Sequence, residues 1–335
     1  MMAKFYHYII NMELEKLSIL VTGGAGFIGS NIVEYLLKNN VKSVKVLDNL
    51  STGSKDNIQH LLDKYTNIEF IWGDIRNLET CRKICKNIDV ICHQAALGSV
   101  PRSIDNPLES HDVNVNGFLN ILLAAKENNI KRIVYASSSS VYGTNNKSIK
   151  IENETGSPLS PYAVTKYIDE LYASVFTQIH GMECLGLRYF NVFGPRQNPN
   201  GAYAAVIPKF IKIILDNKSP IINGDGLYSR DFTYIDNVVN ANILALTTNN
   251  NQCFGQVFNV GTNNSISINV LFESIKKIVN NPNCQAVHGP NRLGDVPYSN
   301  ASVMKISELL GYQPKIYFEE GLKNTVEYFR KIYCD

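Results

Sequence analysis

The chain has 335 residues, of which 44% are hydrophobic and 19% are charged. This composition is typical of a globular protein, and the length suggests two structural units or one large α/β domain with an appendage. The net charge is only +2, with no basic block and no acidic tail, so charge gives no argument for nucleic acid or an anionic membrane as a partner.

The seven cysteines form no CxxC pair, and their odd number and irregular spacing argue against a disulfide framework or a zinc site. We therefore expect reduced thiols, no bound metal and a cytoplasmic location. Residues 1–16 do not resemble a signal peptide, because their short apolar part is broken by Asn11 and followed by Glu13 and Glu15. They favour a short amphipathic lead-in, and no apolar run is long enough for membrane insertion.

From residue 17 onward, short β-branched runs alternate with helical patterns. The predicted strands cover 17–22, 43–48, 68–74, 89–95, 131–138 and 183–190. Near-continuous apolar strands separated by crossover helices predict a parallel sheet covered on both faces. This is the doubly wound α/β, or Rossmann, architecture, in which ligands bind beyond the carboxyl ends of the strands.

Beyond residue 190 the alternation gives way to loops rich in proline, asparagine and glycine. Helical patterns recur near 204–216, 267–280 and 302–310, and a run at 256–262 is predicted to return a strand to the main sheet. The expected division is a dinucleotide-binding domain over 1–190, with a returning segment at about 231–262, and a smaller, irregular C-terminal substrate-binding domain over 191–230 and 263–335.

The turn after the first predicted strand reads VTGGAGFIGSN, which places Gly23, Gly26 and Gly29 between a strand and a helix. Glycines there permit a tight turn and close approach of a pyrophosphate to backbone at a helix N-terminus. Asp48 ends the second strand nineteen residues after Gly29, where a carboxylate accepts hydrogen bonds from ribose hydroxyls. The following NLSTG has no Arg or Lys for a 2′-phosphate, so we expect NAD. Asp74, after the third strand, either covers the adenine or is an ordinary turn residue.

The segment SPYAVTKYIDE at 160–170 predicts a helix start, with Ser160 as N-cap and Pro161 in the first turn. Tyr162 and Lys166 lie one turn apart on one face of this helix. An ammonium about 5 Å from a phenol, at an effective dielectric of about 20, stabilises the phenolate by about 3 kcal/mol and makes it usable as a general base. An isolated YxxxK is more often an exposed Tyr beside a solvated Lys, so this assignment depends on other motifs. The opposite face is predicted to be a buried apolar stripe of Val164, Tyr167, Ile168, Leu171, Tyr172, Val175, Phe176 and Ile179.

The fifth strand runs into YASSSSVYG, which places four serines at the carboxyl end of a central strand. Their hydroxyls are expected to face a ligand, and one of them to bond a substrate oxygen beside Tyr162. A serine-rich turn that bonds its own backbone is the alternative for some of the four.

The motifs TGGAGFIG, Asp48, SSSSVYG and YAVTK, in this order and spacing, resemble the extended short-chain dehydrogenase/reductase family of nucleotide-sugar enzymes. HQAALGSVPRS, LRYFNVFGPRQNPNGAYAAVIP and INGDGLYSRDFTYI further resemble bacterial UDP-N-acetylglucosamine 4-epimerases of surface polysaccharide (O-antigen) synthesis. The resemblance runs from about residue 17 to the C-terminus. It implies an NAD-dependent 4-epimerase that interconverts UDP-GlcNAc and UDP-GalNAc, as a homodimer.

The resemblance also implies roles for individual residues. Tyr162 would be the base, Lys166 its activator and a ligand of the nicotinamide ribose, and Ser138 the catalytic hydroxyl. Tyr162 would take the C4 hydroxyl proton while the C4 hydride goes to NAD, and the 4-keto sugar would then turn over and receive the hydride on its other face. The cofactor-binding residues are predicted to be Gly23, Gly26, Phe27, Ile28, Gly29, Asp48, Asn49, Gly53, Asp74, Ile75, Gln94, Ala95, Ala96, Asn114, Tyr162, Lys166, Tyr189 and Val192.

The sugar nucleotide is expected to contact three groups of residues by the same resemblance. Asn191, Arg230 and Arg292 would hold the diphosphate, since the guanidinium fork suits phosphate, and Ala205, Val206 and Asn223 would hold the uridine. The full predicted substrate set is Ser99, Val100, Ser103, Ser138, Ser139, Ser140, Tyr162, Asn191, Ala205, Val206, Asn223, Arg230, Arg292, Asp295 and Ser299.

Two positions discriminate among reactions and substrates within this family. Ser139 and Ser140 stand where related 4,6-dehydratases carry an Asp-Glu pair, so elimination is disfavoured. Ser299 falls where a bulky Tyr narrows the pocket of some UDP-galactose 4-epimerases, so a 2-acetamido group has room, and Ser103 could bond that group. The alternatives are a 4-epimerase of UDP-N-acetylglucosaminuronate and its galacto epimer, less favoured a UDP-glucose/UDP-galactose epimerase, and, in a different class, a non-catalytic dinucleotide-sensing protein.

Overall fold

Seven parallel strands form the main sheet, and each begins and ends within two residues of its predicted bounds. The computed structural model describes residues 13–200, 204–290 and 297–333. The strands are β1 (Ser18–Thr22), β2 (Ser43–Asp48), β3 (Ile68–Trp72), β4 (Val90–His93), β5 (Arg132–Ser138), β7 (Glu183–Tyr189) and β12 (Gln256–Val260). Their order is β12-β7-β5-β4-β1-β2-β3. Strand order reverses where β1 pairs with both β2 and β4, which opens a crevice at the carboxyl ends. The predicted doubly wound α/β fold is confirmed.

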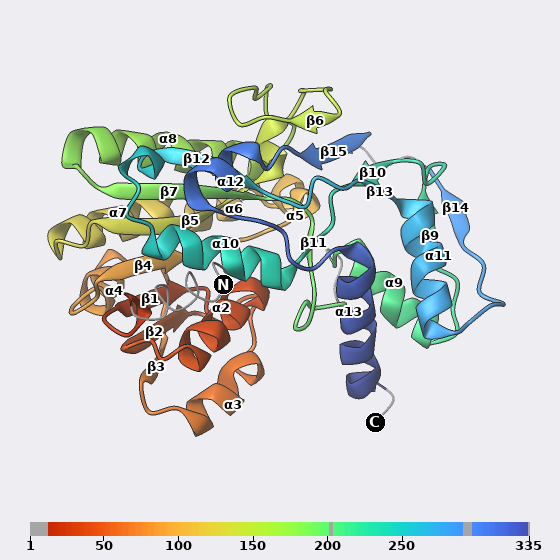
Figure 1. The fold of residues 1–335 in the computed structure, drawn as a ribbon, viewed down its shortest axis with the longest axis horizontal. Helices are drawn as coiled ribbons and strands as arrows, with labels where there is room; N and C mark the ends of the chain where they lie inside the picture. The colour runs from red at the N-terminus through yellow and green to blue at the C-terminus, as the bar shows by residue number, and fades with distance from the viewer. Residues whose placement is uncertain (1–12, 201–203, 291–296, 334–335) are drawn as a thin grey trace.

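Helices cover both faces of this sheet, which is why its strands are apolar on both sides. One face is covered by α2 (Phe27–Lys38), α3 (Asp56–Lys64) and α10 (Ile235–Thr247), whose apolar side chains share one buried cluster. The other face is covered by α4 (Leu78–Ile84), α7 (Gly117–Glu127) and α8 (Pro161–His180), which share a second cluster. Figure 1 shows α7 and α8 side by side. The remaining elements on this side are α5 (Val100–Asp105), α6 (Pro107–His111), the π-helix η1 (Asp112–Asn116) and the 3₁₀ helix η2 (Ser139–Tyr142).

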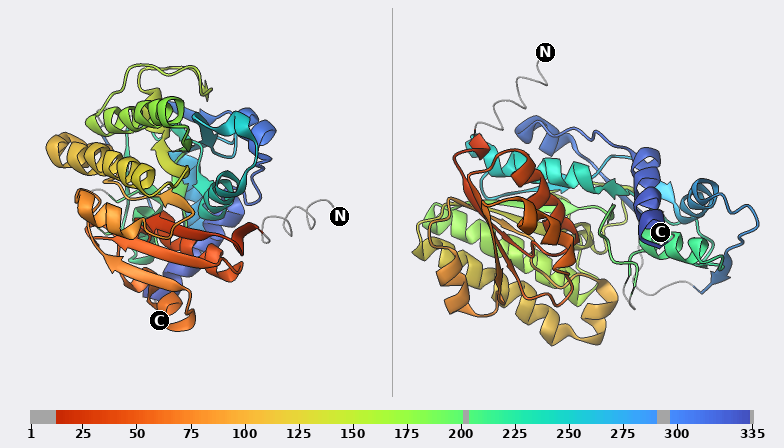
Figure 2. Two further views of the ribbon diagram at one scale, coloured as in Figure 1. Left: turned by 90° about the vertical axis from the view of Figure 1, so that its left-hand side faces the viewer. Right: turned by 90° about the horizontal axis from the view of Figure 1, so that it is seen from below.

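A smaller lobe lies beside the sheet, on the right in Figure 1, and Figure 2 shows it from below. It contains α9 (Val206–Leu215), α11 (Ile268–Val279), α13 (Phe318–Tyr333) and the two-stranded sheet of β9 (Ile221–Asn223) and β14 (Val287–Gly289). The helices pack through apolar side chains, and Arg330 donates hydrogen bonds to the carbonyls of Ile278 (2.8 Å) and Val279 (2.9 Å) at the end of α11.

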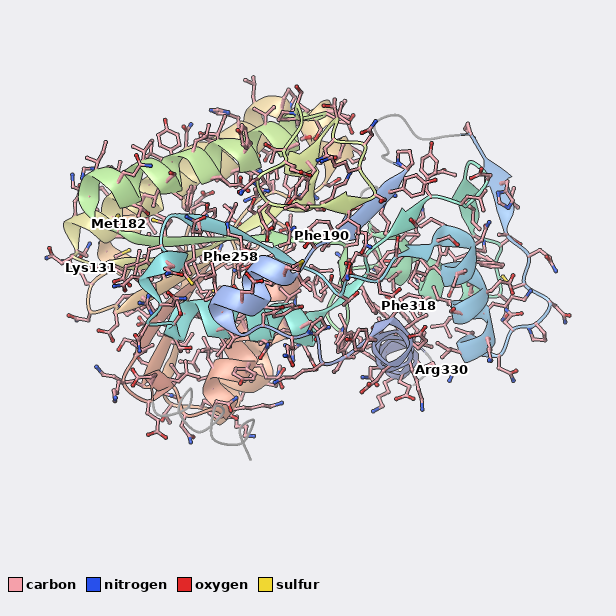
Figure 3. The ribbon with its side chains drawn as sticks, turned by 45° about the horizontal axis from the view of Figure 1, so that its top comes forward. Lys131, Met182, Phe190, Phe258, Phe318 and Arg330 are labelled. Atoms are coloured by element: carbon pink, nitrogen blue, oxygen red, sulfur yellow. The ribbon has the colours of Figure 1, made fainter. Side chains whose placement is uncertain are left out.

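Figure 3 shows which end of the sheet faces this lobe. Lys131 and Met182, which precede β5 and β7, lie far from α13 and its labelled residues Phe318 and Arg330, whereas Phe190, just after β7, lies nearer to them. The carboxyl ends of the strands therefore point towards the lobe, and a crevice at these ends lies between the two parts.

Short strands tie the two parts together. β6 (Ile149–Lys150), from the loop after η2, forms a four-stranded sheet with β10 (Ser229–Arg230), β13 (Ile266–Ser267) and β15 (Tyr298–Ala301). The other connecting elements are β8 (Val192–Phe193), β11 (Thr233–Tyr234), the 3₁₀ helix η3 (Asn251–Cys253) and α12 (Met304–Leu310). The chain passes from sheet to lobe, back to the sheet for α10 and β12, and again to the lobe.

A buried carboxylate fixes this junction. Asp231 is fully buried and accepts hydrogen bonds from the backbone N–H groups of Thr262 (2.9 Å), Asn263 (2.9 Å) and Ala301 (3.2 Å). Burial raises the pKa of Asp231, although these donors oppose the shift. The residue thereby joins β10, the end of β12 and β15.

The prediction that the apolar stripe of α8 is buried is wrong. Val164 (43%), Leu171 (51%) and Ile179 (70%) are among the exposed apolar residues of this helix, together with Tyr172 and Val175, while Phe176 is buried. The inner face instead carries polar side chains, including Lys166, Asp169 and Glu170. Apolar spacing identified one face of the helix correctly, but in this molecule charged pairs hold the opposite face against β5 and β7.

The N-terminal lead-in is described only in part. Residues 1–12 lie outside the described residues, whereas Leu14 is fully buried in the cluster on the α2 side. Across the described ranges no helix combines the length and apolar character needed to cross a bilayer.

Replacing Asp231 with Ala should lower the free energy of unfolding by about 3 kcal/mol, because it leaves buried backbone N–H groups without acceptors. Urea unfolding of the purified protein measures this change. The matched control is Asp63→Ala on α3, an exposed carboxylate whose loss should cost no more than about 0.5 kcal/mol. Equal effects of the two substitutions would contradict the proposed junction.

Candidate active site

The glycine-rich loop between β1 and α2 has no room for a side chain at Gly23 or Gly29. Gly23 has φ of +68°, and a Cβ there would lie 2.7 Å from the backbone nitrogen of Ala95. A Cβ at Gly29 would overlap the carbonyl oxygen of Gly23, so α2 starts directly against the loop. Gly26 is the N-cap of α2 and has no side chain to accept hydrogen bonds from the first turn. The backbone N–H groups of that turn can therefore bind an anion.

Two carboxylates follow at the ends of the next strands. Asp48 is buried and accepts hydrogen bonds from the backbone of Ala25 (3.0 Å) and Leu50 (2.8 Å), which leaves lone pairs for a ligand. Burial raises the pKa of Asp48, and the backbone donors counteract this. At the end of β3, hydrogen bonds from Arg76 lower the pKa of Asp74 to about 2, so this group is anionic at neutral pH.

A cavity of about 300 Å³ opens at these strand ends. Most of the predicted cofactor-binding residues line it: Gly23, Gly26, Phe27, Ile28, Gly29, Asp48, Asn49, Asp74, Ile75, Gln94, Ala95, Ala96, Tyr162, Lys166 and Tyr189. Gly53 and Val192 line the neighbouring cleft instead. Asn114 is not among the lining residues of either cavity. Its side chain accepts from Leu97 N at 2.7 Å and donates to Thr165 Oγ1 at 3.0 Å, so it supports the wall from behind.

These features fit a dinucleotide with a pyrophosphate and a free ribose diol. The loop excludes a Cβ at Gly23 and Gly29, Gly26 leaves the first turn of α2 without a side-chain cap, and Asp48 stands at the end of the second strand with open acceptor sites. Sequence reasoning did not single out Thr52, Leu97, Gly98 and Val113, which also line the cavity. These residues contribute backbone and apolar contacts, for which the sequence carries no distinctive signal.

Helix α8 brings the Tyr and Lys of the YxxxK motif to this cavity. Ser160 Oγ accepts from Ala163 N at 3.2 Å as the expected N-cap. Tyr162 is half-buried and Lys166 almost fully buried, and both line the cofactor cavity. Lys166 Nζ donates to the carbonyl of Ala136 on β5 at 3.0 Å. The ammonium is thus held between the sheet and the helix, one turn from the phenol.

The four serines divide into two roles. Ser137 is buried, donates to Glu170 Oε1 at 2.5 Å and lines the cofactor cavity. Ser138 Oγ accepts from the backbone (3.2 Å) and hydroxyl (3.0 Å) of Ser140 at the start of η2. Ser138, Ser139 and Ser140 are half-buried and are not among the lining residues of either cavity. The serine-rich turn therefore bonds part of its own backbone.

A second, larger cleft of about 1250 Å³ adjoins the first and extends towards the lobe. The two share Gly26, Phe27, Ser51, Thr52 and Gly98. Predicted substrate residues that line the larger cleft are Ser99, Val100, Asn191, Ala205, Val206, Asn223 and Arg230. Arg292 and Asp295 lie outside the described residues.

Two predicted substrate residues are placed differently. Ser103 is fully buried, accepts from Tyr162 N at 3.0 Å and donates to the carbonyl of Val100 at 2.7 Å, so it joins α5 to the start of α8. Ser299 is buried on β15, directly opposite Arg230 on β10. It is therefore a neighbour of a cleft-lining arginine and does not itself line the cleft.

The segment where the cavities meet is conformationally strained. Ser99 has φ of 95°, a region that non-glycine residues rarely occupy. Arg102, in the same segment, lines the larger cleft. It is not among the predicted site residues, although it lies within the GSVPRS motif. Lys209 on α9 also lines the cleft, so Arg102, Lys209 and Arg230 are the three cationic side chains among the described residues that line it.

Comparisons with known proteins agree with this geometry. The model of the NAD dependent epimerase/dehydratase family matches residues 19–261. A solved structure of UDP-N-acetylglucosamine 4-epimerase from Methanobrevibacter ruminantium, in complex with UDP-N-acetylmuramic acid, is 40% identical, with 94% of this chain and 99% of that one covered and a TM-score of 0.88.

Two further solved structures are UDP-glucose 4-epimerases. The one from Thermotoga maritima, with UDP-glucose, is 38% identical, covers 94% of this chain and 99% of that one, and has a TM-score of 0.87. The one from Thermus thermophilus, in complex with NAD, is 33% identical, with the same coverage and a TM-score of 0.84. The resemblance drawn from the motifs is thereby confirmed: the chain belongs to the NAD dependent epimerase/dehydratase family and is an NAD-dependent enzyme of its nucleotide-sugar epimerases.

Proposed function

We propose that this protein is a 4-epimerase that interconverts UDP-GlcNAc and UDP-GalNAc. The observation that carries the proposal is the joint placement of Tyr162 and Lys166 in a cofactor cavity that opens into a larger cleft containing Arg230. A base, its activating cation and a phosphate-binding cation thus surround one continuous space.

The chain's own residues supply the proton chemistry. Tyr162 accepts the proton of the C4 hydroxyl and later returns it, while the Lys166 ammonium stabilises the phenolate. Ser138 bonds the sugar oxygen at the end of β5. NAD, which Asp48 and the glycine-rich loop would hold, would supply the acceptor for the C4 hydride and the source of its return to the opposite face of the sugar. His93 takes no part, since burial, and next Lys166, lower the pKa of His93 to about 3 and keep it neutral.

The other chemistry of this family needs side chains that are missing here. Water elimination needs an acid and a base at positions 139 and 140, where this chain has two serines. Their hydroxyls lack the acidity for that step. Epimerisation needs only Tyr162, Lys166 and a hydrogen-bonding serine, all of which are present.

The choice of an N-acetylhexosamine rests on the space beside Arg230. Ser299 stands opposite Arg230, so a small side chain occupies the position beside this arginine. The cleft volume of about 1250 Å³ exceeds that of most small-ligand sites, which leaves room for a 2-acetamido group and for turnover of the sugar. Ser103 is already bonded on both sides, so it supports the site rather than the acetamido group.

One observation favours a uronate as the second candidate. Arg102 lines the cleft next to Ser99 and Val100, in the segment that adjoins the cofactor cavity, where the reacting ring must lie. A guanidinium there could bind a carboxylate at sugar C6. UDP-N-acetylglucosaminuronate is therefore the competing substrate.

The test is incubation of the purified protein, without added cofactor, with UDP-GlcNAc, UDP-N-acetylglucosaminuronate and UDP-glucose, with the C4 epimers followed by proton NMR. UDP-GlcNAc should be converted fastest. Tyr162→Phe should keep bound NAD but lose turnover by a factor of about 1000 or more. Faster conversion of the uronate would show that UDP-N-acetylglucosaminuronate, and not UDP-GlcNAc, is the preferred substrate. No conversion, even with NAD supplied, would favour a dinucleotide sensor, and near wild-type turnover in Tyr162→Phe would exclude the assigned base.

Ser299→Tyr should change substrate choice, because a phenol beside Arg230 would fill the space for the acetamido group. We expect kcat/KM for UDP-GlcNAc to fall by about 10-fold or more relative to UDP-glucose. Ser299→Ala, which keeps the position small, should leave the ratio unchanged. An unaltered ratio in the Tyr variant would place the acetamido group elsewhere.

We propose further that the enzyme is a homodimer through α8. The exposed apolar residues Val164, Leu171, Tyr172, Val175 and Ile179 form one continuous stripe along this helix. A second copy of the same helix, related by a twofold axis, would cover the stripe with an identical surface.

Leu171→Glu should therefore convert the protein to a monomer, because it places a carboxylate in the middle of this interface. Light scattering after size-exclusion chromatography measures the mass. The control is Val287→Glu, an equally exposed apolar residue on β14 in the lobe, which should not alter the mass. A wild-type monomer, or a dimer that survives the α8 substitution, would refute the interface.

A further inference from the structure

The inner face of α8 carries a charged pair that the reaction scheme leaves unused. Asp169 Oδ2 accepts a hydrogen bond from Lys166 Nζ at 3.2 Å. The two side chains are only 1% and 2% exposed. Asp169 Oδ1 has no hydrogen-bond partner among the described residues. Burying a carboxylate with one unsatisfied oxygen costs free energy of folding, so its place next to Lys166 calls for an explanation.

The groups that face this pair are neutral or already balanced. Glu170, the next residue on α8, is paired with Arg188 of β7 at 2.8 Å. Burial keeps the pKa of His93 (β4) low and that of Tyr135 (β5) high, so both are uncharged at neutral pH. Within the described part of the chain, the net charge at this point therefore depends on Lys166 and Asp169 alone.

Helical geometry places this charge where it acts on the base. Tyr162 and Asp169 are seven residues apart, which is two turns, so both lie on the face that carries Lys166 between them. Their separation along the axis is about 10 Å.

We propose that Asp169 is a positioning residue that acts through Lys166: its side chain holds the ammonium beside the carbonyl of Ala136, and its protonation state sets the net charge presented to Tyr162. This inference rests on the proposed roles of Tyr162 and Lys166. Asp169 thereby helps to set the pH range over which the enzyme is active.

The direction of the effect follows from the charges. Burial raises the pKa of Asp169 to about 7, although Lys166 opposes the shift. As the pH rises through this range the carboxylate forms, offsets the lysine charge and makes the Tyr162 phenolate harder to form. Compared with an enzyme that lacks the Asp169 charge, activity should therefore rise at higher pH. The rise should also extend over a wider pH range than the titration of one group gives.

Asp169→Asn removes the negative charge and keeps an oxygen that can accept from Lys166. A unit charge about 10 Å away at an effective dielectric of about 20 moves a titration by about one pH unit. We expect the half-maximal point on the acid side of the kcat/KM profile to fall by about one unit and the rise to become steeper. Asp63→Asn, an exposed carboxylate on α3, is the matched control and should leave the profile unchanged.

The experiment measures kcat/KM from about pH 5.5 to about pH 9.5 for the NAD-loaded wild type and both variants, with NAD content determined in each. A uniform loss of activity at all pH values, with an unmoved acid limb, would show that Asp169 is merely structural. An unchanged profile would refute the proposal outright. If Asp169→Asn does not fold, Asp169→Ala must show the same direction of shift.

A second readout separates this inference from the proposed function. The tyrosinate absorbance of wild type minus Tyr162→Phe reports the ionisation of Tyr162 without any turnover. If no UDP-sugar is converted, the proposed function fails, yet this difference titration should still move to lower pH in Asp169→Asn. If the sugar is converted but the titration does not move, the inference about Asp169 fails by itself.

Discussion

The arrangement of the site depends on one buried ion pair. Arg188 on β7 and Glu170 on α8 meet at 2.8 Å, with 3% and 7% of their side chains exposed. Arg188 also donates to the carbonyl of Glu152 and lies 4.9 Å from the ring of Tyr142. One guanidinium thus contacts α8, η2 and the loop between β6 and α8. Breaking such a pair leaves an uncompensated buried charge, at a cost of about 3 to 5 kcal/mol. This pair helps to hold the helix that carries Tyr162 and Lys166.

The sheet and the cofactor cavity could be predicted because their causes are local. Apolar runs define the strands, and close contacts require glycine at positions 23 and 29 of the loop. The inner face of α8 could not be predicted, since apolar spacing shows where apolar residues lie and not which face is buried. Ser103 and Asn114 were predicted to contact ligands, but both hold neighbouring loops. A hydroxyl or amide in a motif has the same appearance in either role, and only its hydrogen-bond partners distinguish them.

The border between the two cavities combines rigidity with strain. Ser99 holds an unfavourable φ, Ser103 joins α5 to the start of α8, and Asn114 bonds both Leu97 and Thr165. These contacts connect the wall of the larger cleft to the helix that carries the base. The segment after β4 is thus held in one conformation by several polar contacts, which is the support that a preorganised site requires.

The path of the chain between the two parts has a consequence for synthesis of the protein on the ribosome. The edge of the sheet at β7 is completed by β12, which lies some seventy residues later, after the first part of the lobe. Until residue 260 has emerged, β7 presents an unpaired edge, even though α10 has already been synthesised. Such an edge is a template for pairing with other chains. The nascent protein therefore exposes this edge to other chains until β12 has been synthesised.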